Sequence, residues 1–162
     1  SQQALKEMRL LVYERRPANL GDEGLVGALE LRLRAVERRA GLVARVIAPE
    51  PIDTPADLQE ELYAIAQEAL NNALKHAKAS QVTVRLEGDG EWILLQVEDN
   101  GTGFRLEEAE CQGGMGLSNM RQRADSLGGR LEIESERGQG TIVRARVPRA
   151  GTSAEGASHE LR

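Results

Sequence analysis

Metal-binding and aromatic side chains are scarce in this chain of 162 residues. It has two histidines, His76 and His159, one cysteine, Cys111, and four aromatic residues. A structural zinc site needs about four closely spaced cysteine or histidine ligands, so the sequence excludes one. A single cysteine excludes an internal disulfide, which is typical of a reducing compartment. The sequence also lacks an apolar run of the roughly 20 residues that a membrane-spanning helix requires.

Basic residues are not in excess, because the formal net charge is −5. Proteins that bind nucleic acid directly usually carry a basic excess, so we expect no direct nucleic-acid partner. A local basic cluster is formed by Arg32, Arg34, Arg38 and Arg39, but acidic residues interleave with it. This pattern predicts a solvated helix face.

The hydrophobic periodicity predicts an α/β domain. Apolar residues at spacings of three and four indicate helices over residues 4–15, 25–40, 55–77 and 117–127. Alternating runs indicate a strand at 43–48 and two hairpins, which pair 82–86 with 92–97 and 131–135 with 141–147. We therefore expect one domain at residues 23–148, an N-terminal segment at 1–22, and a disordered tail at 149–162.

One face of the helix predicted at 55–77 carries polar groups in a line. Glu68, Asn72 and Lys75 stand at positions i, i+4 and i+7, while apolar residues occupy the opposite stripe. A carboxylate, an amide and an ammonium group therefore line one side of this helix. This line is the first indication of a functional site.

Two glycine-rich loops add to that indication. Asp99, Gly101 and Gly103 follow a predicted strand, where a carboxylate could accept a hydrogen bond from an exocyclic amine. Gly114 and Gly116 precede a predicted helix, whose free N–H groups and dipole favour phosphate. Neither spacing is that of a Walker loop or a Rossmann fingerprint, and each fragment alone is common in turns.

The ordered set of motifs resembles a known nucleotide-binding family. Residues 68–77, 99–104, 113–117 and 138–141 look like the N box, G1 box, G2 box and closing glycine motif of that family. It includes DNA gyrase, the Hsp90 chaperones, the MutL proteins and the sensor histidine kinases, and is known as the GHKL or Bergerat superfamily. Residues 67–77, 116–124 and 127–133 are most similar to histidine kinases of the nitrate-sensor type. Upstream, residues 7–17 resemble the end of the dimerisation domain, which makes 1–22 a remnant of that domain.

This resemblance implies a role for each motif residue. Asn72 would hold Mg²⁺, Asp99 would accept the adenine amine, and Glu68 would act with Asn72 in catalysis. The implied ATP-binding residues are Asn72, Lys75, His76, Asp99, Gly101, Gly103, Gly114, Met115, Gly116, Leu117 and Thr141. Thr141 would join the hydroxyl network around Asp99, and Arg121 and Arg123 would either approach phosphate or form surface ion pairs.

The resemblance also implies a fold, cofactors and partners. The fold would be an α+β two-layer sandwich, a mixed sheet with helices on one face and ATP held between helix and lid, the lid being residues 105–112. The cofactors would be ATP and Mg²⁺, and the location cytoplasmic. The γ-phosphoryl group would pass to a histidine outside this chain and then to a response regulator of the LuxR/NarL type. The parent protein would be a homodimer, and upstream segments could anchor it in a membrane.

No phosphoacceptor histidine is expected within the chain. His76 is followed by Ala77 and Lys78 and not by the acidic residue of an acceptor context. A nucleotide contact or a helix cap suits it better, so this chain alone is not expected to autophosphorylate and could be monomeric. Two alternatives stay open: a GHKL ATPase or anti-sigma-type serine kinase, and a module that binds nucleotide without phosphotransfer.

Overall fold

A computed structural model describes residues 24–49, 52, 54–75, 78–111 and 115–149. The helix predicted at 4–15 and nearly all of the predicted tail lie outside these residues. Among the described residues, the helices and strands run from Gly24 to Pro148. Within the described residues, no helix is both long and apolar enough to cross a membrane.

The strands form one mixed sheet of five, in the order β1-β2-β3-β5-β4. Their bounds are β1 Val43–Ile47, β2 Gln81–Gly88, β3 Trp92–Asp99, β4 Arg130–Glu136 and β5 Gly140–Pro148. Only the β1–β2 pair is parallel; the other three pairs are antiparallel. Both predicted hairpins are confirmed, because β2 pairs with β3 and β4 pairs with β5.

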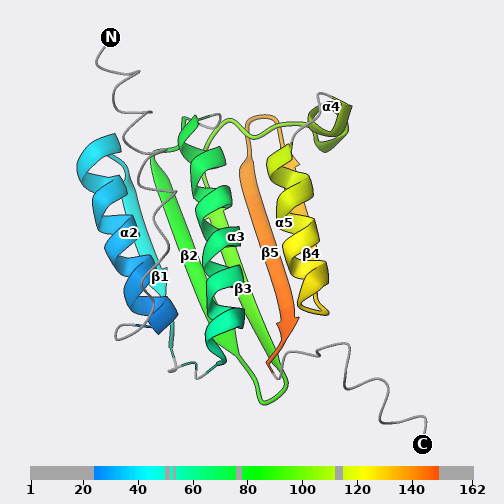
Figure 1. Ribbon diagram of the computed structural model, residues 1–162. Helices are drawn as coiled ribbons and strands as arrows, with labels where there is room; N and C mark the ends of the chain where they lie inside the picture. Colours follow the sequence, from blue (N-terminus) through cyan, green and yellow to red (C-terminus); the bar gives the residue numbers. More distant parts are fainter. Residues whose placement is uncertain (1–23, 50–51, 53, 76–77, 112–114, 150–162) are drawn as a thin grey trace, which may run out of the picture.

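The helices are α2 (Gly24–Ala40), α3 (Ala56–Lys75), α4 (Leu106–Cys111) and α5 (Met115–Ser126). Figure 1 shows α2, α3 and α5 side by side over one face of the sheet, with α4 at one end. The opposite face of the sheet carries no helix in the described part of the chain. The predicted two-layer α+β sandwich is therefore confirmed.

The core lies between α3 and the sheet. Leu62, Ile65 and Leu70 of α3 are fully buried, and so are alternate residues of the central strands. In β3 the residues Ile93, Leu95, Val97 and Asp99 point to the helices, while Trp92, Leu94, Gln96 and Glu98 lie on the other face. The period of two therefore carries Asp99 to the side of the sheet that the helices cover.

The β2–β3 turn shows how local chemistry fixes the hairpin. The Asp89 carboxylate accepts hydrogen bonds from the backbone N–H groups of Glu91 and Trp92, at 2.9 and 2.7 Å. These two bonds stabilise the ionised form and lower the pKa of Asp89. The Asp89 N–H in turn donates to the Trp92 carbonyl, which closes the turn.

One expectation is wrong, and one element was not predicted. Arg32 is not on a solvated face, because it is 2% exposed on the side of α2 that carries Leu29, Leu33 and Val36. Its position three residues after Leu29 places it within the buried stripe, which its charge obscured in the sequence. The predicted lid contains a short helix, α4, whose apolar content is too small to produce a helical period.

Candidate nucleotide-binding site

Asp99 ends β3 as a mostly buried carboxylate, 8% exposed. Its Oδ1 accepts a hydrogen bond of 2.9 Å from the Gly101 N–H. Burial raises the pKa of Asp99, and the backbone N–H groups of Gly101 and Thr141 oppose this rise without cancelling it. A carboxylate held this way can accept a further hydrogen bond from a ligand amine.

Glycines let three backbone segments meet beside Asp99. Gly140 has φ +81°, and a Cβ there would collide with the Asp99 carbonyl oxygen. Gly103 has φ +65°, and a Cβ there would collide with the Glu136 carbonyl oxygen. The Gly138 N–H also donates to the Thr102 carbonyl at 2.6 Å. The loop after β3 is therefore fastened to the β4–β5 turn by backbone contacts that only glycine permits.

A pair of hydroxyl groups lies under the same loop. Ser135 Oγ accepts a hydrogen bond from the Phe104 N–H at 2.9 Å and lies 2.8 Å from Thr141 Oγ1. Thr141 is 8% exposed and pairs in register with Asp99. Its hydroxyl hydrogen bond goes to Ser135, which the sequence analysis did not single out. Ser135 is 31 residues from Phe104 in the chain, so no local signal could have found this contact.

Asn100 was also missed. Its Oδ1 accepts hydrogen bonds from the backbone N–H groups of Ser80 and Gln81, both at 2.9 Å, and its Nδ2 donates to Ser80 Oγ. Asn100 thus ties the end of β3 to the start of β2. This anchor fixes the position of the neighbouring Asp99.

The polar face of α3 meets the start of α5. The Glu68 carboxylate lies against Gly116, where a Cβ would collide with Glu68 Oε1. Asn72, one turn later, is partly exposed, and Lys75 at the end of the helix is exposed. The neighbouring Asn71 is 6% exposed and points to the buried side. Of the two adjacent asparagines, Asn72 is the more exposed, and Glu68, one turn earlier, is partly exposed as well.

Figure 1 shows where the elements that carry these residues lie. The last turns of α3, the end of β3, α4 and the start of α5 lie at the same end of the molecule. An ion pair of 2.5 Å between Glu108 of α4 and Arg137 fastens α4 to the β4–β5 turn. The described part of the predicted lid therefore shares one end of the sandwich with those predicted binding residues that the structure describes.

Some residues predicted to bind ATP have another role in the structure, and others lie outside the described residues. Leu117 is 7% exposed and belongs to the hydrophobic core. Met115 begins α5, whereas His76 and Gly114 lie outside the described residues. Arg123 forms a surface ion pair of 2.8 Å with Glu61 of α3, the second of the two roles expected for it.

The donor set fits a magnesium ion shared with a ligand. The described residues contain no group of three or more His, Cys, Asp or Glu side chains that could hold a metal by themselves. Mg²⁺ prefers oxygen ligands and is commonly held by one or two protein groups together with substrate phosphates. The Asn72 amide oxygen and the Glu68 carboxylate present oxygen atoms on one face of α3. These residues are therefore suited to a metal that arrives with phosphate.

Comparison with known proteins decides the family. Residues 57–151 match the family of histidine kinase-, DNA gyrase B- and HSP90-like ATPases. The chain belongs to this family. It is 34% identical over 155 residues to the sensor histidine kinase LiaS of Bacillus subtilis, a match over 90% of this chain and 40% of LiaS. It is 32% identical over 142 residues to the sensor protein VraS of Staphylococcus saprophyticus, over 88% of this chain and 40% of VraS.

A solved structure supports the same assignment. The histidine kinase domain of the blue-light activated histidine kinase of Erythrobacter litoralis EL346 superimposes with a TM-score of 0.64 and 28% identity. The match covers 77% of this chain and 61% of that domain. The chain is thus a catalytic domain of the histidine kinase type, and it spans about two fifths of the length of LiaS and VraS. The family inferred from the four motifs is confirmed.

Proposed function

We propose that this domain binds Mg²⁺-ATP between α3 and the α4–α5 segment and transfers the γ-phosphoryl group to a histidine outside the chain. The observation that carries the proposal is the meeting of two groups at one end of the sandwich. One is the polar face of α3 that presents Glu68 and Asn72, and the other is the buried Asp99. The Asp99 carboxylate can thus bind the adenine ring at the same end of the molecule where Glu68 and Asn72 offer oxygen ligands to the metal.

Each side chain has a role that its position suits. Asp99 accepts a hydrogen bond from the adenine amine, and this favours adenine because guanine presents a carbonyl at that place. Gly101 and Gly103 allow the backbone to approach the base. Gly116 leaves room for the Glu68 carboxylate beside the first turn of α5. The N–H groups and the helix dipole at the start of this helix, which Gly114 precedes in the sequence, attract phosphate.

Residues of α3 bind the phosphate groups of the nucleotide. Asn72 holds the metal through its amide oxygen, and the exposed Lys75 ammonium group binds phosphate oxygens, as His76 would beside it. When bound, Mg²⁺ neutralises charge that develops on the phosphates. Glu68 orients the proton of the attacking group or of a water molecule. Thr141 supports Asp99 from the adjacent strand, next to Ser135.

The proposal extends to the parent protein. The acceptor histidine would belong to a dimerisation domain, with residues 1–22 as its remnant, and the next acceptor would be an aspartate on a response regulator. Residues 67–77, 116–124 and 127–133 support the nitrate-sensor subgroup and hence a LuxR/NarL-type regulator. We further propose a homodimeric parent with this domain in the cytoplasm.

Incubation with ATP labelled on the γ-phosphorus tests the proposal. The domain is mixed with a separately supplied dimerisation domain that carries the acceptor histidine. Acid-labile, base-stable phosphohistidine on that domain is expected. Release of inorganic phosphate without phosphohistidine would indicate an ATPase of the same family, and nucleotide binding without either product would indicate a binding module. Either of the latter results would overturn the kinase assignment.

A further inference from the structure

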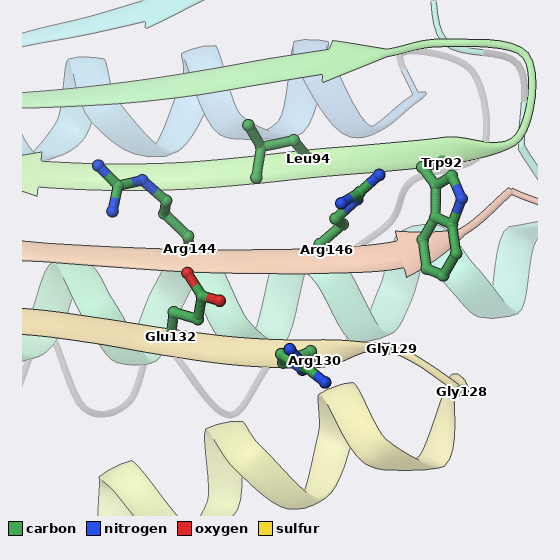
Figure 2. A pocket seen from close by; sticks show the side chains of 8 residues that line it. All are labelled: Trp92, Leu94, Gly128, Gly129, Arg130, Glu132, Arg144 and Arg146. Atoms are coloured by element: carbon green, nitrogen blue, oxygen red, sulfur yellow. The ribbon is translucent and has the colours of Figure 1, made fainter.

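The helix-free face of the sheet carries a hollow, remote from the site just described. It measures about 510 Å³ and is lined by Trp92, Leu94, Arg130, Arg144 and Arg146, among others. Figure 2 shows these side chains on the near side of the strands, with the helices behind the sheet. Trp92 and Asp99 stand at opposite ends of β3 and on opposite faces. The hollow therefore belongs to a different surface from the nucleotide site.

Two arginines in this hollow lie opposite each other. Arg130 of β4 and Arg146 of β5 are directly opposite in the antiparallel register. Like charges in that arrangement destabilise a sheet. Within the described part of the chain, neither guanidinium group forms an ion pair. The nearby Asp89 carboxylate forms no ion pair with Arg146, although Arg146 helps to lower the pKa of Asp89. Arg144, in contrast, is held by Glu134 at 3.1 Å and by Gln96 at 3.0 Å.

Trp92 fixes one of the two arginines. The Arg146 guanidinium carbon lies 4.8 Å from the centre of the Trp92 ring, a cation–π contact. Trp92 is the only tryptophan of the chain, and it lies partly exposed on the open face and not in the core. Tryptophan and arginine are the residues most enriched at the energetic centres of protein interfaces. Leu94, opposite Arg146 on β3, adds an apolar surface beside them.

We propose that this hollow docks an acidic polypeptide segment that carries an apolar side chain among its carboxylates. Carboxylates would bind Arg130 and Arg146, and the apolar side chain would cover Leu94 and the free part of Trp92. Charge complementarity favours this occupant, because Arg130 and Arg146 have no ion-pair partner among the described residues, while Arg144 is paired with Glu134 and one glutamate, Glu132, lies in the lining. Nucleic acid fits less well, because its backbone carries a charge at every nucleotide and would meet Glu132, Glu134 and Glu136 on the exposed side of β4. A short peptide can place its few carboxylates at Arg130 and Arg146 alone.

The unique tryptophan makes the test direct. The probe is a short capped peptide in which glutamates flank one leucine, titrated into the domain while Trp92 fluorescence is recorded. A saturable change is expected, and added salt should weaken the binding. The same peptide with lysine in place of glutamate should produce no saturable change. Absence of saturation with the acidic peptide would overturn the proposal.

Three variants make the test specific. Arg130→Glu and Arg146→Glu should each lower the affinity for the acidic peptide by at least about tenfold, as expected for central interface residues. Arg38→Glu makes the same charge change on exposed α2 and should leave the affinity unaltered. Thermal unfolding midpoints verify that each variant is folded. Equal losses in all three variants would mean that only overall charge matters, which would also overturn the proposal.

Two further probes distinguish an acidic peptide from other ligands that could occupy the hollow. Inorganic tripolyphosphate or a DNA oligonucleotide that binds as tightly as the peptide, with the same loss in Arg130→Glu, would assign the hollow to small anions or nucleic acid instead. Asp99→Asn, which alters the nucleotide site, should leave peptide binding intact. Failure of the docking proposal is thereby distinguishable from failure of the proposed kinase function.

Discussion

The Glu68 carboxylate on α3 packs directly against Gly116 in the first turn of α5, with no room for a methyl group between them. This contact joins α3, which carries Glu68, Asn72 and Lys75 along one side, to α5, which follows the lid. Glu68 can keep its position only while residue 116 lacks a side chain. The glycine at 116 therefore positions a carboxylate as well as exposing backbone N–H groups.

Gly116→Ala should separate activity from stability. Alanine is a better helix former than glycine by about 1 kcal/mol, so the unfolding free energy should change little or rise. The added methyl group should displace the Glu68 carboxylate, and a displacement of about 1 Å can lower a rate on the order of 100-fold. Phosphotransfer rates and urea unfolding measure the two effects.

Gly90→Ala is the matched control. A Cβ at Gly90 meets nothing within 4 Å, and its φ is not in the left-handed region. This variant should retain full phosphotransfer. If Gly116→Ala retains it as well, Glu68 does not need its observed position for catalysis.

Asp99→Asn should weaken ATP binding while it leaves the fold intact or more stable at neutral pH. The amide oxygen can still accept the Gly101 N–H, but the amide nitrogen would face the adenine amine with a second donor. Affinity for ATP, measured by calorimetry, should fall sharply. Undiminished affinity would show that Asp99 does not recognise adenine.

The pH dependence of stability follows from the raised pKa of Asp99. Between the ordinary value of 3.8 and its higher folded value, the folded state binds more protons than the unfolded state. This group therefore lowers the unfolding free energy as pH rises through that window. Asp99→Asn should remove that decline, which denaturant unfolding at several pH values can measure. An unaltered pH profile would contradict the burial of this carboxylate.

The sequence predicted the fold well because its signals are local. The alternation in β2 and β3, with the turn at Asp89, defined that hairpin, and the apolar stripe of α3 defined the central helix. Arg32 was wrongly predicted to be exposed, because charged side chains usually face solvent; it is buried in the structure. Its position within the helical period was the better guide.

The site was only partly predictable for a different reason. Asp99 and Asn72 occur in motifs with a recognisable order, so they could be named. Ser135 and Asn100 act through contacts with residues far away in the chain, at separations of 31 and 20 residues. Such contacts exist only once the sheet has formed, and a lone serine or asparagine in a sequence does not show them.

The adjacent asparagines of α3 provide a matched pair. Asn72→Ala should reduce the use of Mg²⁺-ATP more than the binding of metal-free nucleotide, because it removes an oxygen ligand of the metal. Asn71→Ala changes the same side chain on the buried side of the helix and should leave the Mg²⁺ dependence of phosphotransfer unchanged. Magnesium titrations of both variants measure this difference. Equal losses with and without metal in Asn72→Ala would indicate a packing role instead.

Gly103→Ala and Gly138→Ala should differ in stability although both positions have positive φ, +65° and +85°. In each variant the left-handed backbone costs about 1–2 kcal/mol for a residue with a Cβ. At Gly138 the Cβ meets nothing within 4 Å, so this cost should be the whole effect. At Gly103 the Cβ collides with backbone oxygens of Glu136 and Gly140, which cannot move away as a flexible side chain would. Urea unfolding should therefore show a clearly larger loss for Gly103→Ala, and equal losses would mean that the loop is free to separate from the β4–β5 turn.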